Sequence, residues 1–177
     1  ADKVREATQS ITLTVNGTLH AVEPGGFDVL ASVGSSHSMN EPDVALEGSS
    51  LAQLLYTSGT TAAPKAAMMS HQALMAEYMA CMVELDIKGS EAMLAALPLY
   101  HSAQMHVFLM PALLLGAPVI LLEAPMPDSC LAAIAQHQIT SFFAPPTVWI
   151  SLLRHPQFGQ HDLSTLQKAY YGASIMP

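Results

Sequence analysis

Apolar residues recur along the chain with two spacings, one typical of helices and one typical of buried strands. The clearest helical spacing follows Ser70, a residue type that often caps a helix N-terminus, and it predicts a helix from about His71 to Leu85. Its apolar face comprises Leu74, Tyr78, Cys81, Met82 and Leu85. Further helices are predicted over 101–115, 128–137 and 145–154, and strands over 51–55, 92–97, 118–122, 140–143 and 167–171.

The alternation of strands and helices predicts an α/β fold with a mostly parallel sheet flanked by helices. In such sheets, ligands collect at the carboxyl ends of the strands. Four segments of interest each follow a predicted strand, and they are 57–65, 98–101, 144–147 and 172–174. We therefore expect these four segments to lie close together.

The beginning of the chain has a different pattern. Ile11, Leu13 and Val15 alternate with threonines as in a half-buried strand, and Asn16-Gly17 is typical of a hairpin turn toward residues 18–22. Residues 23–50 are rich in Gly, Ser, Pro and acidic residues, which indicates a connecting loop. We expect a domain boundary there, with residues 1–42 separate from residues 43–177.

Charge and cysteine content exclude some classes of protein. The net charge of -8 argues against nucleic-acid binding, because a basic face supplies most of that affinity. Cys81 and Cys130 have neither the spacing of a metal knuckle nor the density of a secreted disulfide scaffold, which favours the cytoplasm. Residues 92–122 carry no Asp, Glu, Lys or Arg, but Pro, His, Gln and Gly interrupt them, so we expect a buried core rather than a transmembrane segment. A peripheral place at a membrane surface and a homodimer both remain open.

Lys65 is the only Lys or Arg between Glu6 and Lys88, and it ends a run of hydroxyl residues. The hydroxyls can donate to phosphate oxygens, and a glycine among them lets successive backbone N–H groups face one concavity. The residues before the lysine are Thr57, Ser58, Gly59, Thr60 and Thr61. The lysine adds a compact positive charge. The alternative is an ordinary Ser/Thr-rich surface loop with a solvated lysine.

The run is not a Walker A loop, since no glycine precedes Lys65 and an alanine follows it. From Thr57 to Lys65 it resembles the phosphate-binding signature of the adenylate-forming (AMP-binding) superfamily of acyl-CoA synthetases, adenylation domains and luciferases. Ala62 and Ala66 stand where that family normally has glycine. If either position needs a positive φ, alanine costs on the order of 1 kcal/mol there.

Two further stretches resemble segments of the same family, in the same order. They are Leu97-Pro-Leu-Tyr-His101 and Tyr170-Tyr-Gly-Ala-Ser-Ile-Met-Pro177. The first implies that Tyr100 and His101 lie by the carboxylate of the acid substrate, with His101 in a catalytic role. The second implies that Gly172, Ala173 and Ser174 lie between the adenine and the acyl pocket. The family also offers an alternative for residues 11–15, a parallel strand that ends a preceding subdomain.

The resemblance runs from about Asp43 to Pro177 and is strongest to fatty acyl-CoA ligases. It implies a partial N-terminal domain of an enzyme that joins a fatty acid to ATP and then transfers the acyl group to coenzyme A. Thr57 to Thr61 and Lys65 would hold the ATP phosphates, and Thr61 would contact Mg²⁺. The family is much longer than this chain, so we expect turnover to need the remainder of the enzyme. Alternatives are an adenylation domain, an aryl-acid–CoA ligase and a degenerate, non-catalytic phosphate-binding module.

Several other residues could carry chemistry or simply pack. Trp149 is a candidate for lining the acyl pocket, and Phe143 is a weaker one. His71 and His106 have no spacing partner for a metal, so we interpret both as structural. The methionines Met75 and Met79 fit helical core packing better than a lipid-binding surface.

Overall fold

The computed structural model describes residues 12–15, 18–21, 44–57 and 65–175. Its strands are β1 (Thr12–Val15), β2 (Thr18–Ala21), β3 (Leu51–Thr57), β4 (Lys65–Ser70), β5 (Met93–Ala95), β6 (Val119–Leu121), β7 (Ser141–Ala144) and β8 (Lys168–Tyr171). Its helices are α3 (His71–Glu84), the π-helix η1 (Ala103–Leu109), α4 (Met110–Leu114), α5 (Pro127–Gln136), α6 (Pro146–Leu153) and the 3-10 helix η2 (Phe158–Gln160). The chain divides into two compact units, residues 1–45 and 46–177.

In the first unit, β1 and β2 form an antiparallel pair. Thr12 pairs with Ala21 and Val15 pairs with Thr18, so the two strands are joined by residues 16–17. The hairpin predicted from the alternating threonines is therefore confirmed, and β1 is not paired with a parallel strand in the described residues. The Asn16-Gly17 turn itself lies outside those residues.

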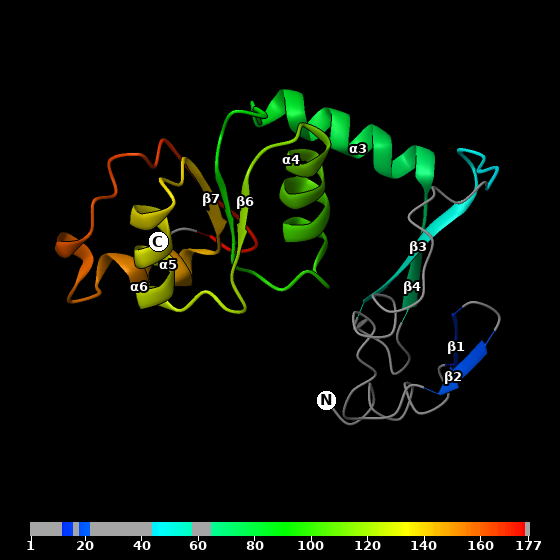
Figure 1. Ribbon diagram of the computed structural model, residues 1–177, viewed down its shortest axis with the longest axis horizontal. Helices are drawn as coiled ribbons and strands as arrows, with labels where there is room; N and C mark the ends of the chain where they lie inside the picture. The colour runs from blue at the N-terminus through cyan, green and yellow to red at the C-terminus, as the bar shows by residue number, and fades with distance from the viewer. Residues whose placement is uncertain (1–11, 16–17, 22–43, 58–64, 176–177) are drawn as a thin grey trace. The chain divides into compact units, whose positions relative to one another are not determined.

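The second unit is built on a four-stranded, all-parallel sheet with the order β6-β5-β7-β8. The chain runs from β5 to β6 through η1 and α4, and then crosses β5 to reach β7 through α5. Figure 1 shows α5 and α6 on one side of these strands and α4 on the other. The predicted α/β class, with a mostly parallel sheet flanked by helices, is confirmed.

Both faces of the two central strands, β5 and β7, are buried, which explains why these strands are short runs of mostly apolar residues. Leu94 and Phe142 are 0% exposed and face a cluster formed with Leu131, Ile134 and Leu152 of α5 and α6. The opposite face packs against η1 and α4. That second cluster comprises Ile87, Met93, Phe108, Ala112, Ala117 and Phe143. Parallel pairing requires long connections between consecutive strands, and the chain supplies a helical one after β5, after β6 and after β7.

Helix α3 begins as the sequence predicts. The Ser70 hydroxyl accepts a hydrogen bond of 3.2 Å from the Ala73 N–H, which satisfies one N–H of the first turn. Leu74 and Tyr78 of the expected apolar face are buried. Met75 and Met79 are exposed, so the prediction that they pack in the core is wrong. Each follows a buried residue, Leu74 or Tyr78, by one position, which places it about 100° further around the helix axis.

The helix predicted over 101–115 is divided into a π-helix and an α-helix. The Met110 N–H donates to the Met105 carbonyl, five residues back, as in a π-turn. Pro111 follows at the start of α4. Proline has no N–H to donate and crowds the preceding turn, which accounts for the change of helix type at this position.

The strand predicted before the phosphate run does not join the parallel sheet. β3 pairs with β4 in a separate antiparallel ribbon, with Tyr56 opposite Ala66 and Thr57 opposite Lys65. The sequence pattern did not reveal β4, because its residues, Lys-Ala-Ala-Met-Met-Ser, show no alternation of polar and apolar positions. The expected convergence of four segments therefore applies, at most, to the three that follow strands of the parallel sheet.

Candidate functional site

A pocket lies at the carboxyl ends of β5, β7 and β8. Its volume is about 450 Å³. Its wall consists of Leu97, Pro98, His101, Ser102, Ala103, Gln104, Phe143, Pro145 and Ala173. From β5 the chain first crosses to β6, on one side of β5, and from β6 it crosses back to β7, on the other side of β5. The strand order therefore reverses between β5 and β7. Ligands of open α/β sheets bind in the crevice at this point.

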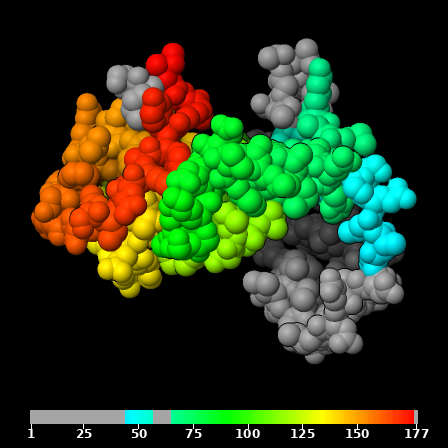
Figure 2. Space-filling view, turned by 90° about the horizontal axis from the view of Figure 1, so that it is seen from above, coloured from blue at the N-terminus to red at the C-terminus, as the bar shows by residue number. Residues whose placement is uncertain are grey.

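Three predicted segments meet in this pocket. Pro98 and His101 come from the segment after β5, Pro145 from the segment after β7, and Ala173 from the segment after β8. Figure 2 shows the red residues near the C-terminus directly beside the green residues of the middle of the chain. The contact between the Phe108 and Tyr170 rings, with centroids 5.1 Å apart, belongs to the same junction.

Tyr100 and His101 hold different positions. His101 lines the pocket and is exposed to solvent. Tyr100 is 72% exposed and is not part of the wall, although its ring centroid lies 4.6 Å from that of His101. Of the two predicted carboxylate contacts, His101 therefore lies in the pocket wall and Tyr100 lies beside His101, outside the wall.

Of the described residues after β8, Ala173 is the one that is part of the pocket wall. Ala173 has a φ of +67°, a conformation that is costly for a residue with a side chain. Gly172 is half-buried beside Phe143, and Ser174 is exposed. Neither residue is part of the wall. A strained residue at a pocket is a frequent feature of functional sites.

Of the two aromatic candidates for the pocket wall, the weaker one lines the pocket and the stronger one does not. Phe143, the weaker candidate, lines the pocket. Trp149 does not line it. Trp149 packs against Phe142 with ring centroids 5.1 Å apart, and its indole N–H donates 2.9 Å to the Tyr170 carbonyl. It lines another hollow of about 290 Å³ between α5, α6 and β8.

Gln104 is a wall residue that the sequence analysis did not single out. It is 1% exposed, and neither polar atom of its amide has a hydrogen-bond partner among the described residues. A signal was present in the sequence, since Gln104 is one of few polar residues in the charge-free segment 92–122.

His106, two residues further along η1, is buried away from this wall. The Tyr78 hydroxyl lies 2.8 Å from its Nδ1, and burial raises the pKa of Tyr78, so the hydroxyl keeps its proton. The pair joins α3 to η1. This contact agrees with the interpretation of His106 as structural.

The described part of the phosphate run consists of its two ends. Thr57 ends β3 and pairs with Lys65, which begins β4 and is exposed. Ser58, Gly59, Thr60 and Thr61, as well as Ala62, lie outside the described residues. Ala66 lies in β4 and is not among the residues with positive φ. The cost expected for alanine in a left-handed conformation therefore does not apply at Ala66.

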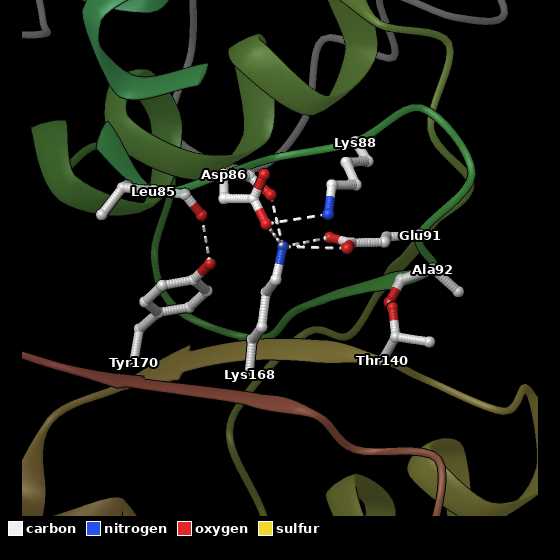
Figure 3. Close-up of polar contacts among 8 residues, drawn as sticks. All are labelled: Leu85, Asp86, Lys88, Glu91, Ala92, Thr140, Lys168 and Tyr170. Atoms are coloured by element: carbon white, nitrogen blue, oxygen red, sulfur yellow. Dashed lines mark hydrogen bonds and ion pairs between the residues drawn. The ribbon is translucent and has the colours of Figure 1, made fainter. Parts of the chain in front are cut away.

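A cluster of charged groups lies at the opposite, amino end of β8 (Figure 3). The Lys168 ammonium donates to both carboxylate oxygens of Glu91, at 2.8 and 2.9 Å, and also contacts the carbonyl and carboxylate of Asp86. Burial lowers the pKa of Lys168, but the hydrogen bonds to Glu91 and Asp86 outweigh it and raise the pKa above its ordinary value. The Tyr170 hydroxyl donates 2.6 Å to the Leu85 carbonyl. The cluster fixes the loop after α3 to the sheet.

Among the described residues, no group of three or more His, Cys, Asp or Glu side chains is placed to hold a metal ion. Thr61, the predicted Mg²⁺ contact, lies outside them. None of the described helices is long and apolar enough to span a membrane.

Comparison with known proteins gives a family and several relatives. The family of AMP-binding enzymes matches residues 2–177. Feruloyl-CoA synthase of Amycolatopsis sp. is 35% identical over 172 residues, which are 97% of this chain and 34% of that protein. Long-chain-fatty-acid–CoA ligase of Bacillus subtilis is 35% identical over 129 residues, which are 72% of this chain and 23% of that protein.

Solved structures share the fold. ATP-bound MatB from Rhodopseudomonas palustris is 26% identical, with a TM-score of 0.67, over 75% of this chain and 26% of that chain. The inhibitor-bound N-terminal domain of FACL13 from Mycobacterium tuberculosis is 24% identical, with a TM-score of 0.77, over 86% of this chain and 38% of that chain. The chain spans about a third or less of the length of the two curated relatives described above.

Proposed function

The chain belongs to the family of AMP-binding enzymes, and on that basis we propose that its full-length protein is an ATP-dependent acid–CoA ligase whose acid is a fatty acid. Residues 43–177 would form part of the ATP- and acid-binding domain, and residues 1–42 the end of a preceding part. The acid–thiol ligase class is supported by the relatives. The fatty acid is our proposal for the substrate.

The observation that carries the proposal is the pocket at the switch point of the parallel sheet. It is largely apolar, it is lined by His101 of one family segment and Ala173 of another, and its mouth is open. An apolar pocket with a few polar groups at one end suits a molecule with an apolar body and a carboxylate. The acyl part would lie against Leu97, Phe143 and Pro145, and the carboxylate near His101.

The reaction would have two steps. The carboxylate oxygen attacks the α-phosphorus of ATP, the bond to the β-phosphate oxygen breaks, and acyl-AMP and pyrophosphate form. The thiol of coenzyme A then loses its proton and attacks the acyl carbon, and AMP leaves. Both steps depend on positioning the reactants and stabilising negative charge, so a protein contributes mainly aligned donors and cations.

The residues of the chain would divide these tasks. Lys65 would neutralise charge on the departing phosphates, together with hydroxyl and N–H groups of Thr57, Ser58, Gly59, Thr60 and Thr61. His101 and Tyr100 would position the carboxylate. Gly172, Ala173 and Ser174 would separate the adenine from the acyl pocket. Mg²⁺ commonly neutralises ATP phosphates, and Thr61 is our proposed contact for it.

An aryl acid is the second candidate substrate, because a specific similarity favours it. Feruloyl-CoA synthase matches 97% of this chain, more than the 72% matched by the long-chain fatty acid ligase. The pocket wall includes the ring of Phe143, which stacks on Phe108 with centroids 4.4 Å apart. An aromatic wall residue can pack against a planar substrate ring.

The test is acid-dependent exchange of pyrophosphate into ATP by the full-length enzyme, with a panel of fatty, aromatic and amino acids. Exchange with fatty acids alone supports our proposal, and exchange with aryl acids alone supports the second candidate. Exchange with amino acids would indicate an adenylation domain. If no acid drives exchange, the proposal is wrong and a degenerate binding module is the better account. In that case, Ala62→Gly would test whether the loop had lost its function.

A further inference from the structure

Tyr170 of β8 stands two residues before Gly172, where the segment 172–174 begins. The Tyr170 hydroxyl donates a hydrogen bond of 2.6 Å to the carbonyl of Leu85, at the C-terminal end of α3 (Figure 3). Burial raises the pKa of Tyr170, so the hydroxyl keeps the proton that it donates. The side chain therefore ties the end of β8 to the end of α3.

A second hydrogen bond holds the same residue from the other side of the sheet. The indole N–H of Trp149, a residue of α6, donates 2.9 Å to the Tyr170 carbonyl. Trp149 packs against the apolar cluster on the α5 and α6 side, whereas the Tyr170 side chain packs against the cluster on the η1 and α4 side. Tyr170 is thus anchored through its side chain on one face and through its backbone carbonyl from the other.

Aromatic contacts lead from Tyr170 to the pocket wall. The Tyr170 ring lies against Phe108 of η1 with centroids 5.1 Å apart, and Phe108 stacks on Phe143 with centroids 4.4 Å apart. Phe143 lines the pocket, and its ring lies beside Gly172, where a Cβ would be 3.4 Å from it. The row of rings therefore begins and ends on the same short stretch of chain, residues 170–172.

The segment that follows needs such support. Ala173 has a φ of +67°, a conformation that persists in a residue with a side chain only where the surroundings impose it. The register with β7 ends at Tyr171, opposite Ala144, so strand pairing in the described sheet does not extend to Ala173. The contacts of Tyr170, just before the strained residue, are placed to impose its conformation.

We propose that Tyr170 is a positioning residue for the nucleotide. By holding the end of β8, it sets the place of Gly172, Ala173 and Ser174, which separate the adenine from the acyl pocket in the proposed function. The inference rests on that function, and it gives Tyr170 no contact with a substrate. A segment that is fixed before the ligand arrives does not have to be ordered at the expense of affinity.

Loss of one anchor should weaken nucleotide binding moderately. Tyr170→Phe removes the hydroxyl and keeps the ring that packs against Phe108. When the segment occupies its binding position only part of the time, the apparent affinity falls by the fraction of time that it does. One intramolecular hydrogen bond shifts such an equilibrium about 3- to 10-fold, so we expect the KM for ATP and the Kd for AMP to rise by this factor.

The experiment uses the full-length enzyme and two ligands that separate the adenine from the departing phosphates. AMP carries the adenine, and its Kd is measured by calorimetry. Pyrophosphate has no adenine, and its KM is measured by acid-dependent exchange, together with kcat and the KM for ATP. The melting temperature of each protein is measured without ligand.

The variants remove one anchor each. Tyr170→Phe removes the bond to Leu85, and Trp149→Phe removes the bond from the other side of the sheet. Lys168→Met is the matched control. Lys168 lies on the same face of β8 and ties it to the same loop after α3, through Asp86 and Glu91, but two residues further from the segment.

We expect Tyr170→Phe and Trp149→Phe each to raise the KM for ATP and the Kd for AMP about 3- to 10-fold. The KM for pyrophosphate and kcat should stay within about twofold of the wild type, because the phosphates do not contact the segment. Lys168→Met should melt at a lower temperature and keep the wild-type value of every constant. If Tyr170→Phe does not fold, Trp149→Phe carries the test.

The inference is wrong if the anchor variants keep the wild-type KM for ATP and Kd for AMP. It is also wrong if Lys168→Met raises these constants as much, because any loosening of β8 would then have the same effect. A fall in kcat alone, in step with the melting temperature, would show that Tyr170 is only structural.

Failure of the proposed function looks different, because it appears in the wild type. If the wild type neither exchanges with any acid nor binds AMP, the proposed function is wrong, and this inference is wrong with it. If the wild type binds AMP without exchange, the Kd for AMP in the variants decides whether Tyr170 positions the nucleotide.

Discussion

The four-stranded parallel sheet and the β3–β4 ribbon are built on different physical principles. In the sheet, Leu94 and Phe142 are 0% exposed because helices cover both faces. In the ribbon, Tyr56 is 67% and Met68 is 75% exposed, and the strands are joined mainly by backbone hydrogen bonds. A two-stranded ribbon whose described side chains are at most half-buried is marginally stable by itself. Burial holds the sheet together, whereas the ribbon depends on its connection to α3.

This difference separates two parts of the proposed active site. The apolar pocket lies on the sheet, where a packed core can fix its walls. The described ends of the phosphate run, Thr57 and Lys65, lie on the ribbon, where several large side chains are exposed. Segments that bind and release ligands are commonly drawn from the less stable parts of a protein. We expect the sheet to determine stability and the ribbon to determine the use of ATP.

The strongest test of the comparison is truncation of the core of the sheet. Phe142→Ala removes a fully buried ring that packs against Trp149, and large aromatic truncations in cores cost about 3–5 kcal/mol. The free energy of unfolding of the full-length protein, measured with urea, should fall by that amount. The matched change in the ribbon, Tyr56→Ala, should cost less than about 1 kcal/mol because the ring is exposed. Equal losses would mean that another part of the polypeptide covers the ribbon.

Removal of the ribbon's cation should affect function without a comparable effect on stability. Lys65→Met deletes a charge that we propose contacts the ATP phosphates, and one charge-assisted contact is worth about 1.5–3 kcal/mol. We expect pyrophosphate exchange at low ATP to fall about 10- to 100-fold, since each 1.4 kcal/mol is a factor of ten. Arg154→Met, which removes an exposed cation at the end of α6, is the control. A similar loss in both variants would argue that net charge, rather than Lys65, supports ATP binding.

The sequence predicted the sheet well because its pattern was unambiguous. Short apolar runs separated by helix-length segments specify a parallel sheet, and Ser70 marked the start of α3 within one residue. The ribbon was predicted poorly. The residues of β4 alternate in neither polarity nor size, so the pairing with β3, a tertiary contact, decides that they form a strand.

The candidate site was predictable as a location but not as a set of side chains. The rule that ligands bind at strand ends placed His101 and Ala173 in one pocket. The same rule gives no side-chain directions, and Trp149 therefore points to the core while Phe143 reaches the wall. Gln104 was missed because burial without a partner is a property of the folded chain. No local pattern in the sequence reports it.

The charged cluster tests whether burial alone stabilises the sheet unit. Lys168→Met removes a half-buried cation from its carboxylate partners Glu91 and Asp86. Because such a pair lies between an exposed and a buried ion pair, we expect the free energy of unfolding to fall by about 1–2 kcal/mol near pH 7. The Lys88 ammonium contacts the exposed carboxylate of Asp86, so Lys88→Met should lower the free energy of unfolding by less than about 1 kcal/mol.

The loss caused by Lys168→Met should depend on pH. Hydrogen bonds from Lys88 and Lys168 hold the pKa of Asp86 below its ordinary value of 3.8. The contribution of the ionised Asp86 to the free energy of unfolding is therefore present above pH 3.8 and disappears as the pH falls below that value. The pKa of Lys168 is raised above its ordinary value of 10.5, so its contribution is complete below pH 10.5 and is lost at higher pH. Unfolding measured from pH 3 to pH 11 should show the largest difference between wild type and variant within this window. A constant difference at every pH would mean that Lys168 acts by packing alone.

The smallest expected effect concerns strain at the pocket. Ala173 has a φ of +67°, where a side chain is unfavourable and glycine is not, so Ala173→Gly should raise the free energy of unfolding by less than about 1 kcal/mol despite the added freedom of the unfolded chain. Ala169→Gly on β8, which has no positive φ, should have the opposite sign because glycine weakens a strand. If both variants are less stable than the wild type, surrounding contacts hold Ala173 in place, and the well-packed sheet tolerates the strain at no net cost. If the two changes in the free energy of unfolding differ in sign as expected, the sheet stores strain at the edge of its own pocket. Relieving that strain with glycine should then change kcat/KM for the acid more than kcat/KM for ATP.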